Sequence, residues 1–191
     1  MSAGRDAYLA HLRALFAEMD AAYARAAAAA GFECRGCRDS CCRSLFHHHT
    51  HLEAIYLREG FGALPQAERE AILARARAAA AVQGLPDGER RPMCPLNAAG
   101  RCRLYMHRPM ICRLHGIAHE LHPPGRPLVI GAGCAEYERA RGAARQGQRF
   151  DRTPLYARMA ALESEFRESE GLRNRVKLTI AEILLAEEAA P

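Results

Sequence analysis

Four of the eight cysteines of this 191-residue chain lie within the short segment from Cys34 to Cys42. Cys34 and Cys37 have the Cys-x2-Cys spacing that lets two thiolates bind one metal from a tight turn. Cys41 follows after three further residues, and Cys42 comes directly after Cys41. Because free cysteines usually occur singly as small buried side chains, this density indicates a metal or iron–sulfur site rather than packing.

The other four cysteines form a second group, which residues 43 to 93 separate from the first. Cys94 and Cys102 flank a predicted β-hairpin with its turn near residues 97–100, which would bring their thiols close together. Because thiolate sulfur is soft, it selects zinc or iron–sulfur clusters over hard cations. The candidate metal ligands are Cys34, Cys37, Cys41, Cys42, Cys94, Cys102, Cys112 and Cys134.

The spacing leaves two arrangements open. In one, Cys34, Cys37 and one member of the Cys41–Cys42 pair share a centre with a fourth ligand from the second group, since adjacent side chains tend to point apart. In the other, two centres have four cysteines each. Cys134 is isolated in the sequence, and the alternative to metal binding is that it is a buried structural thiol. The layout of three cysteines plus a remote one favours an iron–sulfur cluster, 4Fe-4S, over Zn²⁺.

The order of the motifs resembles that of a known family. The matching residues are Cys34-x2-Cys37-x3-Cys41-Cys42, Cys94-Pro-Leu, Gly100-Arg-Cys102 and Tyr105-x2-Arg108-Pro109-x2-Cys112-Arg113. This pattern resembles the CxxCxxCC family, a zinc- or iron-chelating domain also called the YkgJ-like cysteine cluster family, over roughly residues 31–134. The resemblance implies metal chelation by these cysteines. Some relatives are associated with flagellin lysine methylation, in which the cysteines hold an iron–sulfur cluster.

Arginines and histidines accompany the cysteines. Arginines beside the cysteines could offset the charge of a thiolate site and donate hydrogen bonds to sulfur; they are Arg35, Arg38, Arg43, Arg101, Arg103, Arg108 and Arg113. Among them, Arg108 and Arg113 belong to the family pattern. His115 has chelating spacing from Cys112 and is an alternative ligand, with His119 one helical turn further. The cluster of His47, His48, His49 and His51 is interpreted as a solvated patch.

The composition is that of an ordinary soluble protein, with 49% hydrophobic and 26% charged residues. No apolar run is long enough for a membrane span, and no signal peptide is recognisable, so a reducing cytoplasmic location and no membrane partner are expected. In that compartment eight cysteines favour metal binding over disulfides. The net charge of +5 is spread along the chain and gives only weak support for nucleic-acid binding. Whether the protein binds a protein partner is left open by the sequence.

The hydrophobic pattern predicts a mainly α fold, with a helical bundle-like frame around a cysteine-rich metal site and a small β-hairpin near residues 94–105. We expect a single domain over residues 1–191, with an N-terminal helix at 5–30, a cysteine-cluster core at 31–134 and C-terminal helices at 153–187. Gly31 should end the first helix. Thr153 is the expected N-cap of the first C-terminal helix, and the last helix is expected over about residues 173–187. Within the core, Thr50 and Glu53 form a capping box for a short helix to about residue 59. A further helix from Pro65 to about residue 83 and a short strand at 128–130 are also predicted.

These observations predict a metal-binding cysteine cluster protein, whose iron–sulfur centre is structural or electron-carrying. One alternative is a zinc-binding structural protein. Another is a cluster-dependent enzyme related to flagellin lysine methylation, although no Gly-rich cofactor loop and no nucleophile–base motif is recognisable in the sequence. Whether the protein is an enzyme, and on what substrate, is left open by the sequence.

Overall fold

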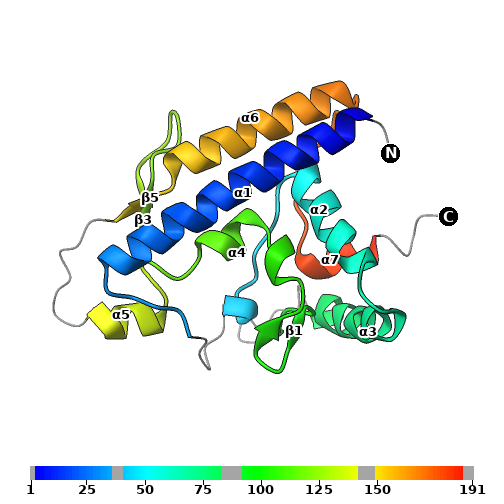
Figure 1. Ribbon diagram of the computed structural model, residues 1–191, viewed down its shortest axis with the longest axis horizontal. Helices are drawn as coiled ribbons and strands as arrows, with labels where there is room; N and C mark the ends of the chain where they lie inside the picture. The colour runs from blue at the N-terminus through cyan, green and yellow to red at the C-terminus, as the bar shows by residue number, and fades with distance from the viewer. Residues whose placement is uncertain (1–2, 36–40, 83–91, 142–148, 187–191) are drawn as a thin grey trace. The chain divides into compact units, whose positions relative to one another are not determined.

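The computed structural model describes residues 3–35, 41–82, 92–141 and 149–186 (Figure 1). The chain divides into two compact units. Unit 1 comprises Met1–Cys37 and Met110–Arg173, and unit 2 comprises Arg38–Pro109 and Asn174–Pro191. The expected single domain over residues 1–191 stays a prediction.

Unit 1 combines two long helices with short elements. Its helices are α1 (Ala3–Ala29), α4 (Met110–Leu114), α5 (Ala135–Arg141) and α6 (Thr153–Ser169), and its strands are β3 (His119–Leu121), β4 (Val129–Gly131) and β5 (Phe150–Asp151). The sheet order is β4-β3-β5; β3 is antiparallel to β4 and parallel to β5. The helix α1 packs against both α6 and α4.

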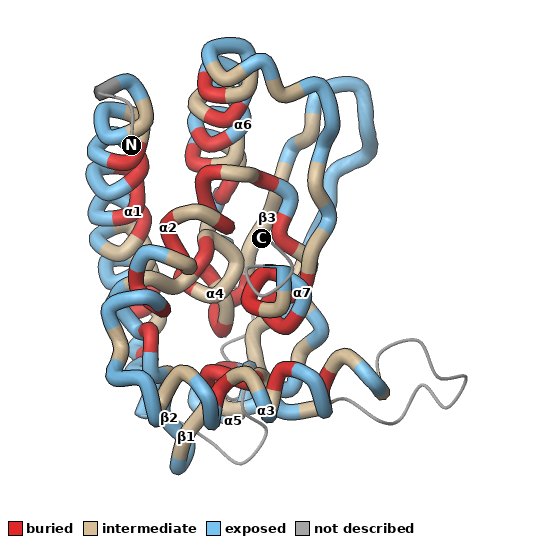
Figure 2. The backbone as a smooth tube through the Cα atoms, turned by 90° about the vertical axis from the view of Figure 1, so that its right-hand side faces the viewer, coloured by how far each residue is buried: buried red, intermediate tan, exposed pale blue. Residues whose placement is uncertain are grey.

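The two long helices of unit 1 are held by apolar stripes. Leu12, Phe16 and Met19 recur at helical spacing on α1 and are fully buried, as are Met159 and Phe166 on α6. Figure 2 shows the buried residues along one side of each of these two helices. The helix α1 is followed by Gly31, whose φ of +63° is the left-handed conformation that commonly terminates a helix.

Unit 2 is mostly helical. Its described residues form the 3-10 helices η1 (Cys41–Arg43) and η2 (Tyr105–His107), the α-helices α2 (His51–Gly62), α3 (Gln66–Val82) and α7 (Ile180–Leu185), and the strands β1 (Asn97–Ala98) and β2 (Arg101–Cys102). One apolar core joins α2, α3, α7 and the hairpin segment; its fully buried members include Leu57, Ile72, Ile183 and Leu184. Leu96 and Leu104, which flank the hairpin strands, are buried in the same core.

The predicted mainly α fold and the small hairpin are confirmed. Thr50 is the N-cap of α2, as predicted, and its hydroxyl oxygen accepts from the Glu53 backbone N–H at 3.2 Å. The Glu53 carboxylate accepts from the Thr50 hydroxyl at 2.7 Å. The predicted strand at 128–130 lies one residue later, as β4. The strands β3 and β5 and the helix α5 were not predicted, because elements this short show no periodicity.

The C-terminal helix differs from the prediction. Instead of spanning 173–187, α7 begins at Ile180, after a capping box in which Thr179 is the N-cap and Glu182 reaches back to its backbone. The preceding residue, Leu178, forms an antiparallel bridge with His48. The segment before Thr179 is therefore extended, because it pairs with a distant part of unit 2 that sequence periodicity does not reveal.

The start of α6 also differs. Thr153 was predicted as the N-cap, but Arg152 occupies that position and Thr153 is the first helical residue. The Thr153 hydroxyl instead accepts a 2.9 Å hydrogen bond from the His122 backbone N–H. The Thr153 backbone N–H donates to the Asp151 side chain at 2.8 Å, so the aspartate satisfies one helix-terminal donor.

Candidate metal centre

The hairpin of unit 2 aligns two of the predicted ligands. In the antiparallel pair, Asn97 lies opposite Cys102 and Ala98 lies opposite Arg101. The turn residues Ala99 and Gly100 have φ of 51° and 81°, as a two-residue type I′ hairpin turn requires. Cys94 lies just before β1, and its carbonyl accepts from the Asn97 backbone N–H at 2.9 Å. The hairpin therefore holds Cys94 and Cys102 on neighbouring segments.

The two cysteines have the same local geometry. The backbone N–H of Leu96 donates to the Cys94 sulfur, and the backbone N–H of Leu104 donates to the Cys102 sulfur. In both cases the donor is two residues after the cysteine, and the donor's side chain is buried in the core of unit 2. Because N–H donors favour the thiolate over the thiol, this repeated arrangement suits two metal-binding sulfurs.

A cysteine of the first group lies beside this hairpin. The Cys94 backbone N–H donates a 2.7 Å hydrogen bond to the carbonyl oxygen of Cys42. Cys42 is in the middle of η1 and is partly buried, whereas Cys41 is exposed. We call Cys42, Cys94 and Cys102 the unit 2 thiol group; it joins parts of both cysteine groups of the sequence.

Burial and neighbouring thiols raise the pKa of both hairpin cysteines of the unit 2 thiol group. Burial, opposed by the Leu96 hydrogen bond and reinforced by the Cys42 and Cys102 thiols, raises the pKa of Cys94 to about 12. The pKa of Cys102 is also raised, mainly by burial and further by Cys42. Without a bound cation the thiols of Cys94 and Cys102 are protonated at neutral pH, so metal binding by these two residues would release protons.

Two arginines contribute positive charge to the thiols. The charge of Arg75, on α3, acts to lower the pKa of Cys94, and that of Arg108 acts to lower the pKa of Cys102. The Arg75 Nε donates to the Pro95 carbonyl at 2.8 Å, which anchors the residue after Cys94. The Arg108 guanidinium lies 3.4 Å from the centre of the Tyr105 ring. Arg108 was predicted from the family pattern, whereas Arg75 was missed.

One feature of the sequence could have identified Arg75 as a residue with a partner inside the fold. It lies on the same stripe of α3 as Ile72, Ala76 and Ala79, all of which are buried. An arginine on the core-facing stripe of an amphipathic helix is unusual and needs a partner inside the fold. Here that partner is the cysteine-bearing loop.

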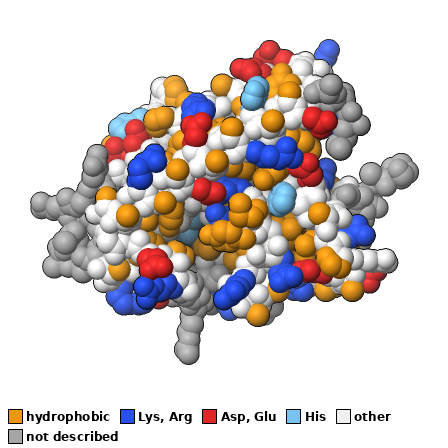
Figure 3. Space-filling model, in the orientation of Figure 1, with side chains coloured by type: hydrophobic (Ala, Val, Ile, Leu, Met, Phe, Trp, Pro, Cys, Tyr) orange, Lys and Arg blue, Asp and Glu red, His pale blue; other side chains and the backbone are white. Residues whose placement is uncertain are grey.

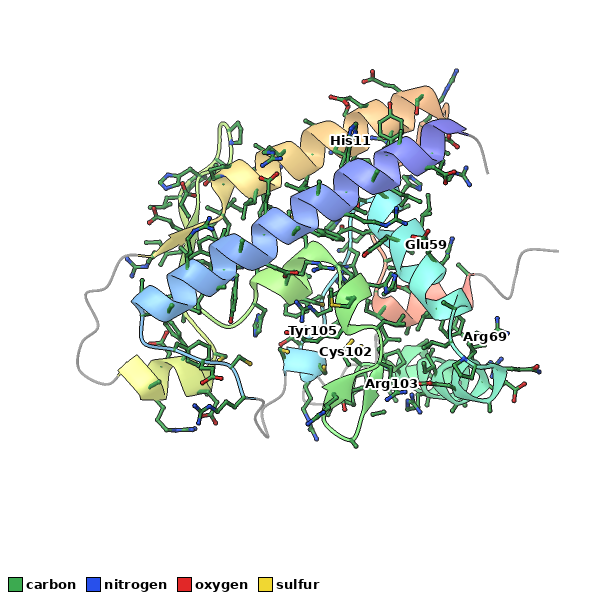
Figure 4. The ribbon with its side chains drawn as sticks, in the orientation of Figure 1. His11, Glu59, Arg69, Cys102, Arg103 and Tyr105 are labelled. Carbon is green, nitrogen blue, oxygen red and sulfur yellow. The ribbon has the colours of Figure 1, made fainter. Side chains whose placement is uncertain are left out.

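The described residues do not form a complete coordination shell. Within the ranges that the structure describes, no three His, Cys, Asp or Glu side chains are arranged to hold a metal ion together. Figure 4 labels Cys102, Arg103 and Tyr105 along the segment that leads from β2 into η2. The donor chemistry of the unit 2 thiol group fits a thiophilic metal, and Cys37 lies outside the described residues.

Three other arginines beside the cysteines pair with carboxylates. Arg35 pairs with Glu33 at 2.7 Å, and Arg103 pairs with Glu68 on α3. Arg113 pairs with Asp20 at 2.5 Å and lies over the Phe16 ring. These three arginines therefore form ordinary ion pairs with carboxylates, which favours that role over one as partners of the cysteine sulfurs. Arg38 lies outside the described residues.

The described cysteines of unit 1 lie on separate segments. Cys34 is exposed shortly after α1, Cys112 is in α4 and Cys134 directly precedes α5. The Cys134 backbone N–H donates to the Gly116 carbonyl at 2.9 Å, and its side chain packs beside a core cluster that contains Phe32 and Tyr137. This packing is consistent with the structural alternative for Cys134. None of the described cysteines forms a disulfide with another.

His115 and His119 lie near a buried arginine of unit 1. Burial, and after it the charge of Arg152, lowers the pKa of both histidines. Arg152 is only 3% exposed and donates to the Leu114 carbonyl. Both imidazoles are therefore neutral at pH 7, the form that a metal ligand requires. The role of His115 as an alternative ligand stays a prediction.

The interpretation of the histidine cluster as a solvated patch is wrong for His48. That side chain is 2% exposed, and its backbone pairs with Leu178 on both sides, with N···O distances of 2.7 and 3.0 Å. His49 is exposed, whereas His51 Nε2 lies 3.0 Å from the Asn174 carbonyl. The histidines of this cluster therefore differ in exposure, because the backbone of His48 pairs with Leu178 in the C-terminal segment of unit 2.

Surface charge gives no prominent binding face in the view of Figure 3, where basic and acidic side chains of the described residues are interspersed. The described helices include none that is both long and apolar enough to cross a membrane.

Comparisons with family models, with curated proteins and with solved structures find no match to this chain. The resemblance to the CxxCxxCC family therefore stays a prediction that depends on the motifs quoted above.

Proposed function

We propose that this protein binds a thiophilic metal centre through its cysteines, as a 4Fe-4S cluster with Zn²⁺ as the alternative. The centre is structural or electron-carrying. The observation that supports this function is the unit 2 thiol group, in which a backbone hydrogen bond joins the segment of Cys42 to the hairpin that carries Cys94 and Cys102.

Three features of that group favour a metal over inert thiols. Backbone N–H groups are directed at two of the sulfurs, and Arg75 and Arg108 supply positive charge. The segment is rigidly supported, since Leu96 and Leu104 are buried in the core of unit 2. Preorganised donors and counter-charges are the surroundings that tune thiolate metal sites. The predicted cytoplasmic location is part of this proposal, because a reducing compartment keeps thiols available.

The identity of the metal is tested by purifying the full chain anaerobically. We expect a brown protein with iron and acid-labile sulfide and a broad visible absorption band. Colourless protein with stoichiometric zinc would establish the zinc alternative, and protein without either metal after anaerobic reconstitution would refute the proposed function.

The structural role is tested by chelation. A structural metal contributes on the order of 10 kcal/mol to folding, so removing it should lower the thermal unfolding temperature and expose the cysteines to thiol reagents. An unchanged unfolding temperature, with metal demonstrably removed, would instead favour the electron-carrying role. Calorimetric binding of S-adenosylmethionine would favour the cluster-dependent enzyme related to flagellin lysine methylation.

A further inference from the structure

We propose that unit 1 binds a small monovalent anion, such as a carboxylate group, at the buried guanidinium of Arg152. Tyr23, Tyr156 and the segment 114–116 contribute the neighbouring polar groups. The inference concerns unit 1 alone, so it does not rest on the proposed metal-binding function.

The guanidinium of Arg152 is held by two contacts. Arg152 is the N-cap residue of α6 and is only 3% exposed. Its Nη2 donates to the Leu114 carbonyl at the end of α4, and its side chain also hydrogen-bonds with the side chain of Tyr156, one turn further along α6. The Arg152 backbone N–H donates to the Glu120 carbonyl on β3 at 3.0 Å. The position of this side chain is therefore set from α4, β3 and α6.

Tyr23 and Cys134 approach the same place from other elements. Gly116 lies two residues after the carbonyl that Arg152 contacts, and its φ is +114°. A Cβ at Gly116 would lie 3.0 Å from the Tyr23 hydroxyl oxygen and 4.0 Å from the Cys134 sulfur. The Cys134 backbone N–H donates to the Gly116 carbonyl at 2.9 Å. Polar groups from α1, α6 and the segment before α5 therefore converge next to the loop that holds the guanidinium.

Unit 1 places no carboxylate against this guanidinium. None of the ion pairs among the described residues includes Arg152. Asp151 and Glu120 are its neighbours through the backbone, but their carboxylates contact the Thr153 backbone N–H and the His122 ring. The residues of unit 1 outside the described ranges include no Asp or Glu in the sequence.

A buried cation without a counter-ion is unfavourable, since buried charges in proteins are normally paired. Burial lowers the pKa of Arg152, as expected for such a cation. The Arg152 Nε is buried and has no hydrogen-bond partner among the described residues. A guanidinium has more N–H donors than its contacts with one carbonyl and one phenol use. A bound anion would supply both a negative charge and a further acceptor.

The chemistry of the site selects the class of anion. One guanidinium balances one negative charge, and its planar fork matches the two oxygens of a carboxylate. A phosphate dianion would bring a second negative charge into a buried site that has no second cation to balance it. The side chains of Tyr23 and Tyr156 are partly exposed, so a small anion can approach the guanidinium beside them.

Formate is the probe for this site. It is titrated into the full wild-type chain in a zwitterionic buffer without chloride, and binding is measured by saturation-transfer NMR on the formate proton. We expect saturable transfer and a rise in the thermal unfolding temperature with formate concentration, because a ligand of the folded state stabilises it. Phosphate at matched ionic strength should bind more weakly. Phosphate that binds as tightly as formate would overturn the choice of a carboxylate.

Substitutions in unit 1 locate the binding. Arg152→Gln should weaken formate binding by more than about tenfold, and Tyr156→Phe by about three- to tenfold. The matched controls are Arg158→Gln, an exposed arginine of α6, and Tyr8→Phe, whose hydroxyl donates to the Glu165 carbonyl; both should change affinity less than about twofold.

Two results would overturn the site. A wild-type chain without formate-dependent transfer would leave Arg152 with a structural role only, and equal losses in Arg152→Gln and Arg158→Gln would show unspecific attraction to surface charge. If Arg152→Gln does not fold, judged by circular dichroism, Tyr156→Phe is compared with Tyr8→Phe, and equal affinities of these two variants would refute the inference.

Discussion

The backbone N–H of Cys94 donates a 2.7 Å hydrogen bond to the carbonyl of Cys42, so the two cysteine groups of the sequence meet through the main chain. This contact does not depend on the protonation or oxidation of either thiol. It therefore holds the two cysteine-bearing segments together without a metal, which would lower the ordering cost of the proposed site.

Arg75, on α3, should support the proposed metal site. Replacing Arg75 with Ala removes the 2.8 Å hydrogen bond to the Pro95 carbonyl and a positive charge near Cys94. We expect metal retention in a chelator competition to fall about tenfold. Arg75→Lys should recover part of this loss through its charge. The matched control is Arg77→Ala, an exposed position of the same helix; equal effects of Arg75→Ala and Arg77→Ala would contradict a specific role.

Gly60 permits close packing of η2 on α2. A Cβ at Gly60 would lie 2.4 Å from the His107 ring, so Gly60→Ala should destabilise unit 2 by about 1–3 kcal/mol. Gly62→Ala is the control, because nothing lies within 4 Å of its Cβ position and alanine favours the helix. Urea unfolding measures both. Adding His107→Ala should reduce the cost of Gly60→Ala, and strictly additive effects would argue against the clash.

The partly buried ion pair of unit 1 should contribute more than an exposed one. The Arg113 side chain is 3% exposed and pairs at 2.5 Å with Asp20, whose side chain is 37% exposed, so Arg113→Ala removes a buried side chain together with its ion pair and its contact with the Phe16 ring. We expect a loss of about 1–3 kcal/mol in the free energy of unfolding. Arg158→Ala, which removes the exposed pair with Glu18, should cost less than about 1 kcal/mol. Similar losses for both variants would contradict this ranking.

Burial of His48 predicts a pH dependence of stability. Burial lowers the pKa of His48 from 6.5 to about 4, so the unfolded state takes up the proton first as the pH falls. The stability from burying the neutral imidazole is therefore complete above pH 6.5 and is lost progressively towards pH 4. At pH 5 the expected loss is on the order of 2 kcal/mol relative to pH 7.

Urea unfolding at pH 7 and pH 5 measures this loss. His48→Gln should flatten the difference between the two pH values, whereas His49→Gln, at the exposed neighbouring position, should retain it. An unchanged pH dependence in His48→Gln would assign the effect to other groups.

The hairpin turn carries strain at one residue. Ala99 has φ of 51°, a conformation that costs a non-glycine residue on the order of 1 kcal/mol. Ala99→Gly should therefore raise the thermal unfolding temperature slightly, whereas Gly100→Ala, at φ of 81°, should lower it. Two shifts of the same sign would contradict the type I′ turn.

The sequence by itself determined the local features of this protein. Helical periodicity and the glycine at position 31 predicted α1, the Thr50 and Glu53 pair predicted the start of α2, and turn chemistry predicted the hairpin at Cys94 and Cys102. Each of these signals lies within a few residues of the element that it specifies, because caps, turns and amphipathic stripes are local interactions.

Only the tertiary structure decided the features that depend on distant residues. Arg75 reaches the cysteine loop, His48 is buried by pairing with Leu178, and that pairing shortens α7. The difference between Cys41 and Cys42 belongs here too. Adjacent cysteines are equivalent in composition and spacing, and only packing distinguishes the exposed Cys41 from the partly buried Cys42.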